Sequence, residues 1–186
     1  VIEKCSEYNQ PLYIAFIDYE KAFDSVEISV VMQALWNQGV DEVYINILEQ
    51  IYRESTATIV LHKEINRIPI KKGVRQGDTI SPMLFIACLQ EVFRSLEWEQ
   101  LGIRVNGEYL SNLRFADDIA LLSNSEDELQ LMITELDKDS RKVDLKSNLQ
   151  KTKVMYNNLG IEQRFQIGNS ALQVVKDYVY LGQVIT

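Results

Sequence analysis

The sequence is short of cysteine, histidine and positive charge, and each shortage excludes a class of protein. Its 186 residues include two cysteines, Cys5 and Cys88, and one histidine. These cannot form a disulfide framework, a zinc site or a centre that needs several histidines, and they indicate an intracellular setting. No apolar run reaches the roughly 18 residues of a membrane span, and residues 1–10 are too polar for a secretory signal.

Positive charge is scarce because 27 acidic residues face 19 basic ones, which gives a net charge of −8. Nucleic-acid-binding domains usually carry a basic surface. If the chain binds nucleic acid, that surface is therefore local or lies on another part of a longer protein. The hydrophobic fraction of 46% fits one folded domain, and the missing initiator Met predicts a piece cut from a longer chain.

Hydrophobic patterns separated by turn signals predict a mixed α and β domain. Asp24, Asp41, Ser81 and Ser125 stand at expected helix starts, and Glu27 completes a capping-box pattern with Asp24. The predicted helices are 24–38, 41–53, 81–96 and 125–142, and the predicted strands are 12–17, 55–61, 65–71, 103–105, 109–114, 119–123, 151–156, 164–167 and 178–182. Because hairpins replace regular βαβ units, we expect an α+β fold with an antiparallel sheet.

Three acids stand where buried strands end. Asp117 and Asp118 are adjacent inside an otherwise apolar string, and Asp18 directly follows the strand 12–17. Neighbours in a strand point to opposite faces, so two acids inside a strand would bury a charge at high cost, whereas a tight turn avoids this. If the strands are neighbours, Asp18 and Asp117 meet and can hold Mg²⁺. Taken singly, each acid fits an ordinary turn better than a metal site.

Two tight turns complete the pattern. Asn106-Gly107 separates two predicted strands and is typical of a hairpin. Gly73 and Gly77 bracket Arg75 and Gln76 just before a predicted helix start. Glycine lets a backbone approach a ligand closely, and helix N-termini favour anions. Taken alone, however, this segment is better explained as a plain loop leading into a helix.

Taken together and in order, five segments resemble the palm motifs of reverse transcriptases. They are 16–24, 73–85, 115–118, 146–155 and 180–182, and the resemblance spans about residues 11 to 182. The sequences of these motifs are most similar to those of non-LTR (LINE-type) retrotransposon enzymes. The resemblance implies that residues 1–186 form an α+β polymerase palm, with an antiparallel sheet packed on helices, partial fingers and no thumb.

The resemblance also implies a metal centre. Asp18 and Asp117 would be the main ligands of two Mg²⁺ ions, with the Tyr19 carbonyl and Asp118 close by, and Mn²⁺ can substitute. Lys151 would lie near the leaving phosphates as a general acid, and Lys153 is the competing candidate. Both lysines also fit a solvated strand edge.

The remaining matched residues would hold the substrates. The resemblance assigns nucleotide binding to Tyr19, Phe23, Arg75, Gln76 and Gly77, and primer positioning to Tyr180, Leu181 and Gly182. The Phe23 ring would lie under the sugar and exclude a ribose 2′-hydroxyl, although a core aromatic fits the same position.

The implied function is an RNA-directed DNA polymerase that adds dNTPs to a DNA primer on a template RNA. Fingers, thumb and endonuclease are then expected elsewhere in a longer polyprotein, found in the nucleus and in a cytoplasmic ribonucleoprotein. Two alternatives remain: a catalytically inactive relic or domesticated nucleic-acid-binding module, and an RNA-templated RNA polymerase. Ala116 and Phe23 favour DNA synthesis over RNA synthesis.

The fourth motif departs from the family pattern at two positions. The family normally has a glycine and an apolar residue where this chain has Asp144 and Ser147. These departures leave the local turn and the position of Lys151 open, and they are compatible with decay in an inactive relic.

Overall fold

The computed structural model describes residues 1–53, 56–61, 64–69, 72–74, 78–160 and 164–186. Its helices are α1 (Ile2–Glu7), α2 (Ala22–Ser25), α3 (Ile28–Asn37), α4 (Glu42–Arg53), α5 (Ser81–Arg94) and α6 (Glu126–Arg141). Its strands are β1 (Tyr13–Ile17), β2 (Thr56–Leu61), β3 (Glu64–Pro69), β4 (Ile103–Val105), β5 (Glu108–Leu110), β6 (Asn112–Phe115), β7 (Asp118–Ser123), β8 (Lys153–Tyr156), β9 (Gln166–Ile167), β10 (Ser170–Ala171), β11 (Gln173–Val174), β12 (Tyr178–Tyr180) and β13 (Gln183–Ile185). Within these ranges no helix is long and apolar enough to cross a membrane.

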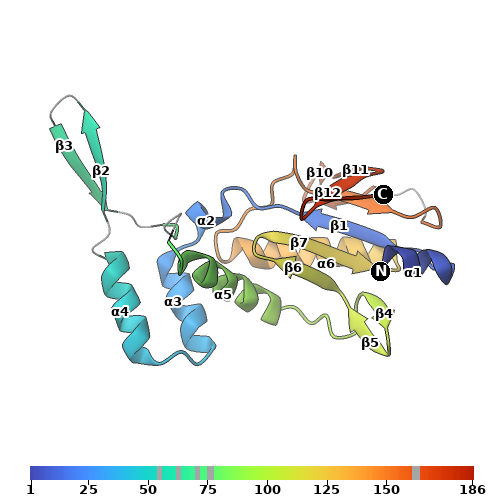
Figure 1. The fold of residues 1–186 in the computed structure, drawn as a ribbon, viewed down its shortest axis with the longest axis horizontal. Helices are drawn as coiled ribbons and strands as arrows, with labels where there is room; N and C mark the ends of the chain where they lie inside the picture. The colour runs from blue at the N-terminus through green and yellow to red at the C-terminus, as the bar shows by residue number, and fades with distance from the viewer. Residues whose placement is uncertain (54–55, 62–63, 70–71, 75–77, 161–163) are drawn as a thin grey trace.

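A five-stranded sheet forms the centre of the molecule, in the order β11-β8-β1-β7-β6 (Figure 1). The pairs β1–β7, β1–β8 and β6–β7 are antiparallel, and the edge strand β11 runs parallel to β8. The expected α+β fold with a mainly antiparallel sheet is therefore confirmed. The strand that precedes Asp18 is central, so its carboxyl end lies between two neighbouring strands.

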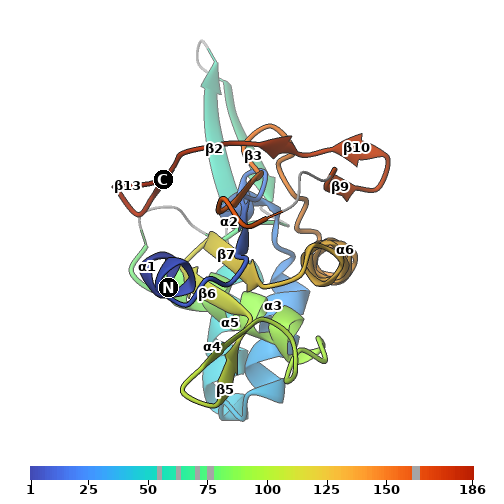
Figure 2. The ribbon, with the colours of Figure 1, turned by 90° about the vertical axis from the view of Figure 1, so that its right-hand side faces the viewer.

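Both faces of β1 are buried, which explains its continuous apolar sequence. On one face, Tyr13, Ala15 and Ile17 belong to the main core with residues of α3, α5 and α6. On the other face, Ile14 and Phe16 belong to a smaller core that includes residues of α1 and the partly buried aromatic rings of β12. Accordingly, α1 and α6 lie on opposite sides of the sheet (Figure 2).

The segments between the first and second motifs extend away from the sheet. Helix α3 packs against α5 and α4, while the β2–β3 hairpin projects at the far end of the molecule (Figure 1). The described parts of this hairpin are antiparallel, as the sequence predicts. The expectation that these segments form partial fingers stays a prediction.

The predicted helix 24–38 is wrong at its start, because the structure divides it into α2 and α3. The carbonyls of Phe23 and Val26 accept hydrogen bonds from the amides of Val74 (2.7 Å) and Gly73 (2.8 Å), instead of continuing a helix. Glu27 caps α3 by backbone geometry alone, with an extended φ of −73° and ψ of 134°, so the predicted capping box does not form. A long-range contact therefore overrides the local signal.

The other helix starts agree with the sequence, with one exception. Asp41 Oδ1 accepts from the Val43 amide at 2.9 Å, and the Ser125 hydroxyl accepts from Glu128 at 3.5 Å. Ser81, however, is not the cap of α5: it is a buried residue of the first turn, and Ile80 is the N-cap.

The predicted strand 109–114 is also divided. Asn106 and Gly107 form the expected hairpin turn between β4 and β5, with φ of 52° and 93°. Beyond that turn, the Ser111 carbonyl accepts from the Leu122 amide at 2.8 Å, and β6 joins the central sheet. The chain thus changes sheets at Ser111 just before it reaches the acidic turn.

Candidate functional site

The acidic pair lies at a tight turn at one end of the central sheet. Phe115 pairs with Asp118 across the β6–β7 hairpin, which leaves Ala116 and Asp117 as the two turn residues. Ala116 has a φ of 54°, in the left-handed region. Asp118 begins β7 and is exposed. The turn therefore places both carboxylates at the end of the sheet without burying them inside a strand, as the sequence predicts.

The antiparallel register brings Asp18 to the same place. Ile17, the last residue of β1, pairs with Ile119, so Asp18 lies next to the start of β7. The carboxylates influence one another: desolvation raises the pKa of Asp118, and the negative charges of Asp117 and Asp18 raise it further. Three acids from two distant segments thus share one electrostatic site.

Asp18 is held by its backbone while its carboxylate remains incompletely satisfied. Its amide donates to Thr152 Oγ1 at 3.3 Å, and its carbonyl accepts from the Asn148 amide at 2.7 Å. In contrast, its Oδ1 atom is buried and has no hydrogen-bond partner among the described residues. A buried carboxylate oxygen is costly without a partner, and a hard cation is a suitable one.

The donor chemistry of Asp18, Asp117 and Asp118 therefore fits Mg²⁺. Within the described part of the chain, however, no group of three or more His, Cys, Asp or Glu side chains already surrounds a common point. The acids share a site but would have to adjust their side chains to share a cation.

The Tyr19 side chain is a structural anchor. It is buried, its hydroxyl lies 2.6 Å from Ser140 Oγ, and burial raises the pKa of its phenol. Its backbone forms a bridge with Ser147. Any direct role of Tyr19 in binding therefore belongs to its main chain.

A cavity of about 880 Å³ lies next to Asp18: its lining includes the adjacent Tyr19 and Lys151, the ion-pair partner of Asp18, but none of the three acids themselves. Its basic members are Lys21, Lys72, Lys146 and Lys151, and its acidic members include Glu20, Asp24 and Asp144. The volume is within the range of sites that hold small molecules and nucleotides. The four lysines exceed the three acids of the lining by one, so the cavity is slightly basic on a chain whose net charge is −8.

Phe23 directly precedes Asp24, which lines this cavity, and its ring packs on a second aromatic ring. It is half-buried and stacks on the buried Phe85 ring with 4.8 Å between centroids. The segment that contains Gly73 packs tightly against the backbone of the next residue, Asp24. A Cβ at Gly73 would lie 2.9 Å from the Asp24 backbone, and Gly73 has a φ of +85°. Glycine is therefore required there for close packing. The other proposed nucleotide-binding residues of this motif, Arg75, Gln76 and Gly77, lie outside the described residues.

The two candidate lysines have different surroundings. Lys151 Nζ lies 3.6 Å from Asp18 Oδ2, in a turn just before β8. Lys153, the first residue of β8, donates to Gln173 Oε1 at 2.7 Å and to the Gln150 carbonyl. The structure thus brings Lys151, and not Lys153, to the acids.

The C-terminal motif reaches the site through aromatic side chains. Leu181 and Gly182 form the β12–β13 turn with φ of 50° and 77°. The Tyr180 hydroxyl lies 3.5 Å from the Asp118 carbonyl oxygen.

Tyr178, which sequence analysis missed, stacks on Phe16 with 4.1 Å between centroids. Its spacing of two from Tyr180 was the available signal, because such residues share a face of a strand.

The acids of the site also affect the pKa of Tyr178 and of Tyr180. Desolvation raises the pKa of both phenols; Asp18 and Asp118 raise that of Tyr178 further, and Asp118 raises that of Tyr180. Both hydroxyls therefore remain protonated at neutral pH and can donate hydrogen bonds.

Comparison with known proteins gives three findings. The family model described as "Reverse transcriptase (RNA-dependent DNA polymerase)" matches residues 2–185. The Pol polyproteins of the type-1 retrotransposable element R2 from Nasonia vitripennis and Popillia japonica are 36% and 35% identical over 68% and 64% of this chain. The chain spans only 12% and 17% of the length of these relatives.

Solved structures show the same fold at low sequence identity. Apo telomerase from Candida tropicalis, truncated from the C-terminal domain, superposes with a TM-score of 0.63 at 16% identity, over 90% of this chain and 35% of that one. Telomerase from Candida albicans, in complex with a fragment of telomeric RNA, gives a TM-score of 0.61 at 15% identity, over 92% and 31%.

Proposed function

Because the chain belongs to the reverse transcriptase family, we propose that it forms the palm and part of the fingers of an RNA-directed DNA polymerase from a non-LTR retrotransposon. The observation that carries the proposal is the meeting of Asp18, Asp117 and Asp118 at one end of the sheet, beside a cavity that contains four lysines. The longer polyprotein would supply the remaining fingers, the thumb and an endonuclease, and would act in the nucleus and in a cytoplasmic ribonucleoprotein.

The acids would hold the metal. Asp18, the Tyr19 carbonyl, Asp117 and Asp118 would bind two Mg²⁺ ions, or Mn²⁺ in their place, which supply charge neutralisation at the reacting phosphate and at the primer 3′-hydroxyl. The raised pKa of Asp118 and the unsatisfied Asp18 Oδ1 support this assignment, because both carboxylates gain from a neighbouring cation.

The other side chains would position the substrates. Lys21 and Lys146 of the cavity would bind the dNTP triphosphate, and Lys151 would hold a proton at Nζ for the leaving pyrophosphate. The Phe23 ring, fixed by Phe85, would exclude a ribose 2′-hydroxyl. Arg75, Gln76 and Gly77 would line the nascent base pair, and Tyr180, Leu181 and Gly182 would position the primer end. Most of the catalysis would then come from positioning and electrostatics.

The test is nucleotide incorporation by the parent-length protein on an RNA template with a DNA primer and Mg²⁺. We expect extension with dNTPs and little with rNTPs. Equal or better extension with rNTPs would identify an RNA polymerase. Binding of the template–primer without extension by either set would identify a non-catalytic binding module.

A further inference from the structure

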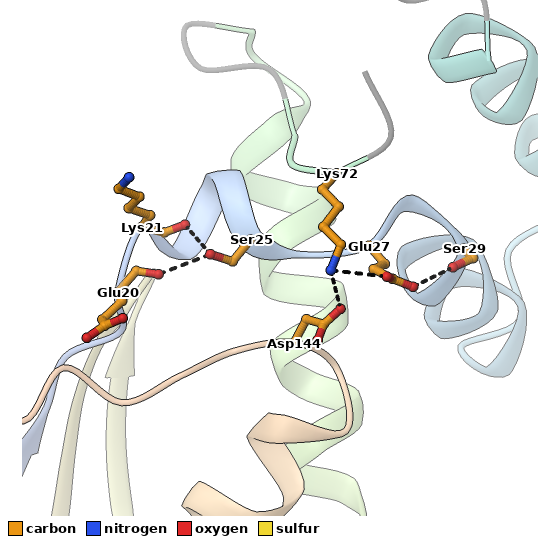
Figure 3. Close-up of polar contacts among 7 residues, drawn as sticks. All are labelled: Glu20, Lys21, Ser25, Glu27, Ser29, Lys72 and Asp144. Atoms are coloured by element: carbon orange, nitrogen blue, oxygen red, sulfur yellow. Dashed lines mark hydrogen bonds and ion pairs between the residues drawn. The ribbon is translucent and has the colours of Figure 1, made fainter. Parts of the chain in front are cut away.

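One ammonium group joins three distant segments at the wall of the cavity. Lys72 Nζ lies 2.7 Å from Asp144 Oδ2 and 3.2 Å from Glu27 Oε1 (Figure 3). Lys72 follows the β2–β3 hairpin, Glu27 caps α3, and Asp144 lies in the turn after α6. We refer to these three side chains as the Lys72 cluster.

The Lys72 cluster stands at the start of the loop that carries Lys151. Asp144 has a φ of 61°, the left-handed conformation that glycine, asparagine and aspartate tolerate best. The next residue, Leu145, is fully buried in the main core. Asp144 thus takes the backbone conformation of the glycine usual in the family, and its carboxylate forms an ion pair that glycine could not.

Ser147, the second residue that departs from the family pattern, has a hydrogen-bond partner for its hydroxyl group. Ser147 is buried and donates to Asp137 Oδ1 at 2.9 Å, an acid of α6 that also accepts from Arg141 at 2.8 Å. The Asn148 amide then bonds the Asp18 carbonyl, and Lys151 lies opposite the Asp18 carboxylate. The loop is therefore fixed at both ends by polar contacts.

We propose that the Lys72 cluster is a positioning device that holds the 144–151 loop and thereby keeps the Lys151 ammonium against Asp18. The inference rests on the proposed polymerase function for the role of Lys151. In this arrangement Lys72 binds two carboxylates and not the substrate phosphates, although Lys72 lines the same cavity.

The electrostatics agree with this arrangement. Hydrogen bonding to Lys72 lowers the pKa of Asp144, and the same contacts with Asp144 and Glu27 raise the pKa of Lys72. Lys72 and Asp144 are therefore both charged at neutral pH. Because exposed ion pairs contribute little to global stability, the effect of breaking them should be local to the loop.

The kinetic test uses the parent-length protein with saturating RNA template and DNA primer. Lys72→Met and Asp144→Asn should each lower the single-turnover rate by about 10-fold or more, since small misplacements of a catalytic group are costly. The dNTP concentration for half-maximal rate should change by less than about 2-fold, because binding groups are retained. Lys72→Arg should keep most of the rate, because its guanidinium can still pair with both Asp144 and Glu27.

Lys142→Met is the matched control. It removes an ion pair between the exposed Lys142 ammonium and the buried Asp139, at 2.6 Å, from the same end of α6 but outside the cavity. We expect this variant to retain the wild-type rate. A large rise in the half-maximal dNTP concentration for Lys72→Met, with no such rise for Asp144→Asn, would overturn the proposal and make Lys72 a phosphate ligand.

Amide hydrogen exchange, measured on the same proteins without substrates, separates the two proposals. Exchange across residues 144–151 should be faster in Lys72→Met and Asp144→Asn and should stay near the wild-type rate in Lys72→Arg. Unchanged exchange in the single variants would refute the loop-holding role whatever the activity. If the wild-type protein extends no primer but exchange responds as expected, the proposed function fails and the loop-holding role stands.

Discussion

At the scale of single residues, the end of the sheet carries like charges at close range, and this costs stability. Asp117 and Asp18 disfavour the ionised form of Asp118, which desolvation already disfavours. Functional sites commonly sacrifice stability in this way, because groups arranged for a ligand repel one another when it is absent. The same arrangement makes the site responsive to a divalent cation.

Replacing Asp118 with Asn should therefore stabilise the metal-free chain at neutral pH. The pKa of Asp118 is raised above its ordinary value of 3.8, so its destabilising effect is absent at low pH and develops as the pH rises through that value. Thermal unfolding should show a higher Tm for Asp118→Asn at pH 7 and no gain at pH 3. Mg²⁺ should raise the Tm of the wild-type chain more than that of the variant. A lower Tm at pH 7 would contradict the proposed repulsion.

Phe23 allows a second test at this scale. Phe23→Ala in the parent-length protein should reduce discrimination against rNTPs by at least about 10-fold, since steric exclusion in a pocket commonly has that size. Phe93→Ala is a suitable control, because Phe93 packs on Trp98 and Arg114 away from the cavity. Unchanged sugar selection in Phe23→Ala would leave Phe23 with a packing role alone.

At the scale of elements, local sequence signals predicted most helices and strands but not where long-range contacts interrupt them. The strand before Asp18 and the hairpin turn at Asn106 follow from local patterns. The break between α2 and α3 does not, because it depends on hydrogen bonds from Gly73 and Val74. The short strands β10, β11 and β13 and the N-terminal helix α1 were also missed, because each has too few residues for a periodic pattern.

A substitution at Gly73 tests the contact between segment 72–74 and α2 that interrupts the predicted helix. Gly73→Ala should destabilise the chain by more than the roughly 1–2 kcal/mol of a left-handed alanine, because its Cβ would also lie 2.9 Å from the Asp24 backbone. Gly107→Ala is the matched control: its φ is +93°, but nothing lies within 4 Å of its Cβ. Urea unfolding of both variants measures the difference. Equal losses would show that segment 72–74 does not pack closely on α2.

At the scale of the whole molecule, sheet topology explains how acids a hundred residues apart in sequence form one site. The order β8-β1-β7-β6 places the end of β1 beside the β6–β7 turn. The residues alone predicted this meeting only if the two strands were neighbours, and the family resemblance supplied that condition. The contacts of Lys72 and Asp137 were not predictable, since each joins segments whose proximity only the folded chain determines. The net charge of −8 is likewise uninformative by itself, because the lining of one cavity still contains four lysines against three acids.

The most direct test of the central claim is primer extension on an RNA template by the parent-length protein beside its Asp117→Ala variant. Circular dichroism and gel filtration should first establish that both are folded. The account predicts Mg²⁺-dependent addition of dNTPs by the wild-type protein and a loss of activity to background in the variant. Undiminished extension by Asp117→Ala, or none by either folded protein, would contradict the assignment of a polymerase centre to this end of the sheet.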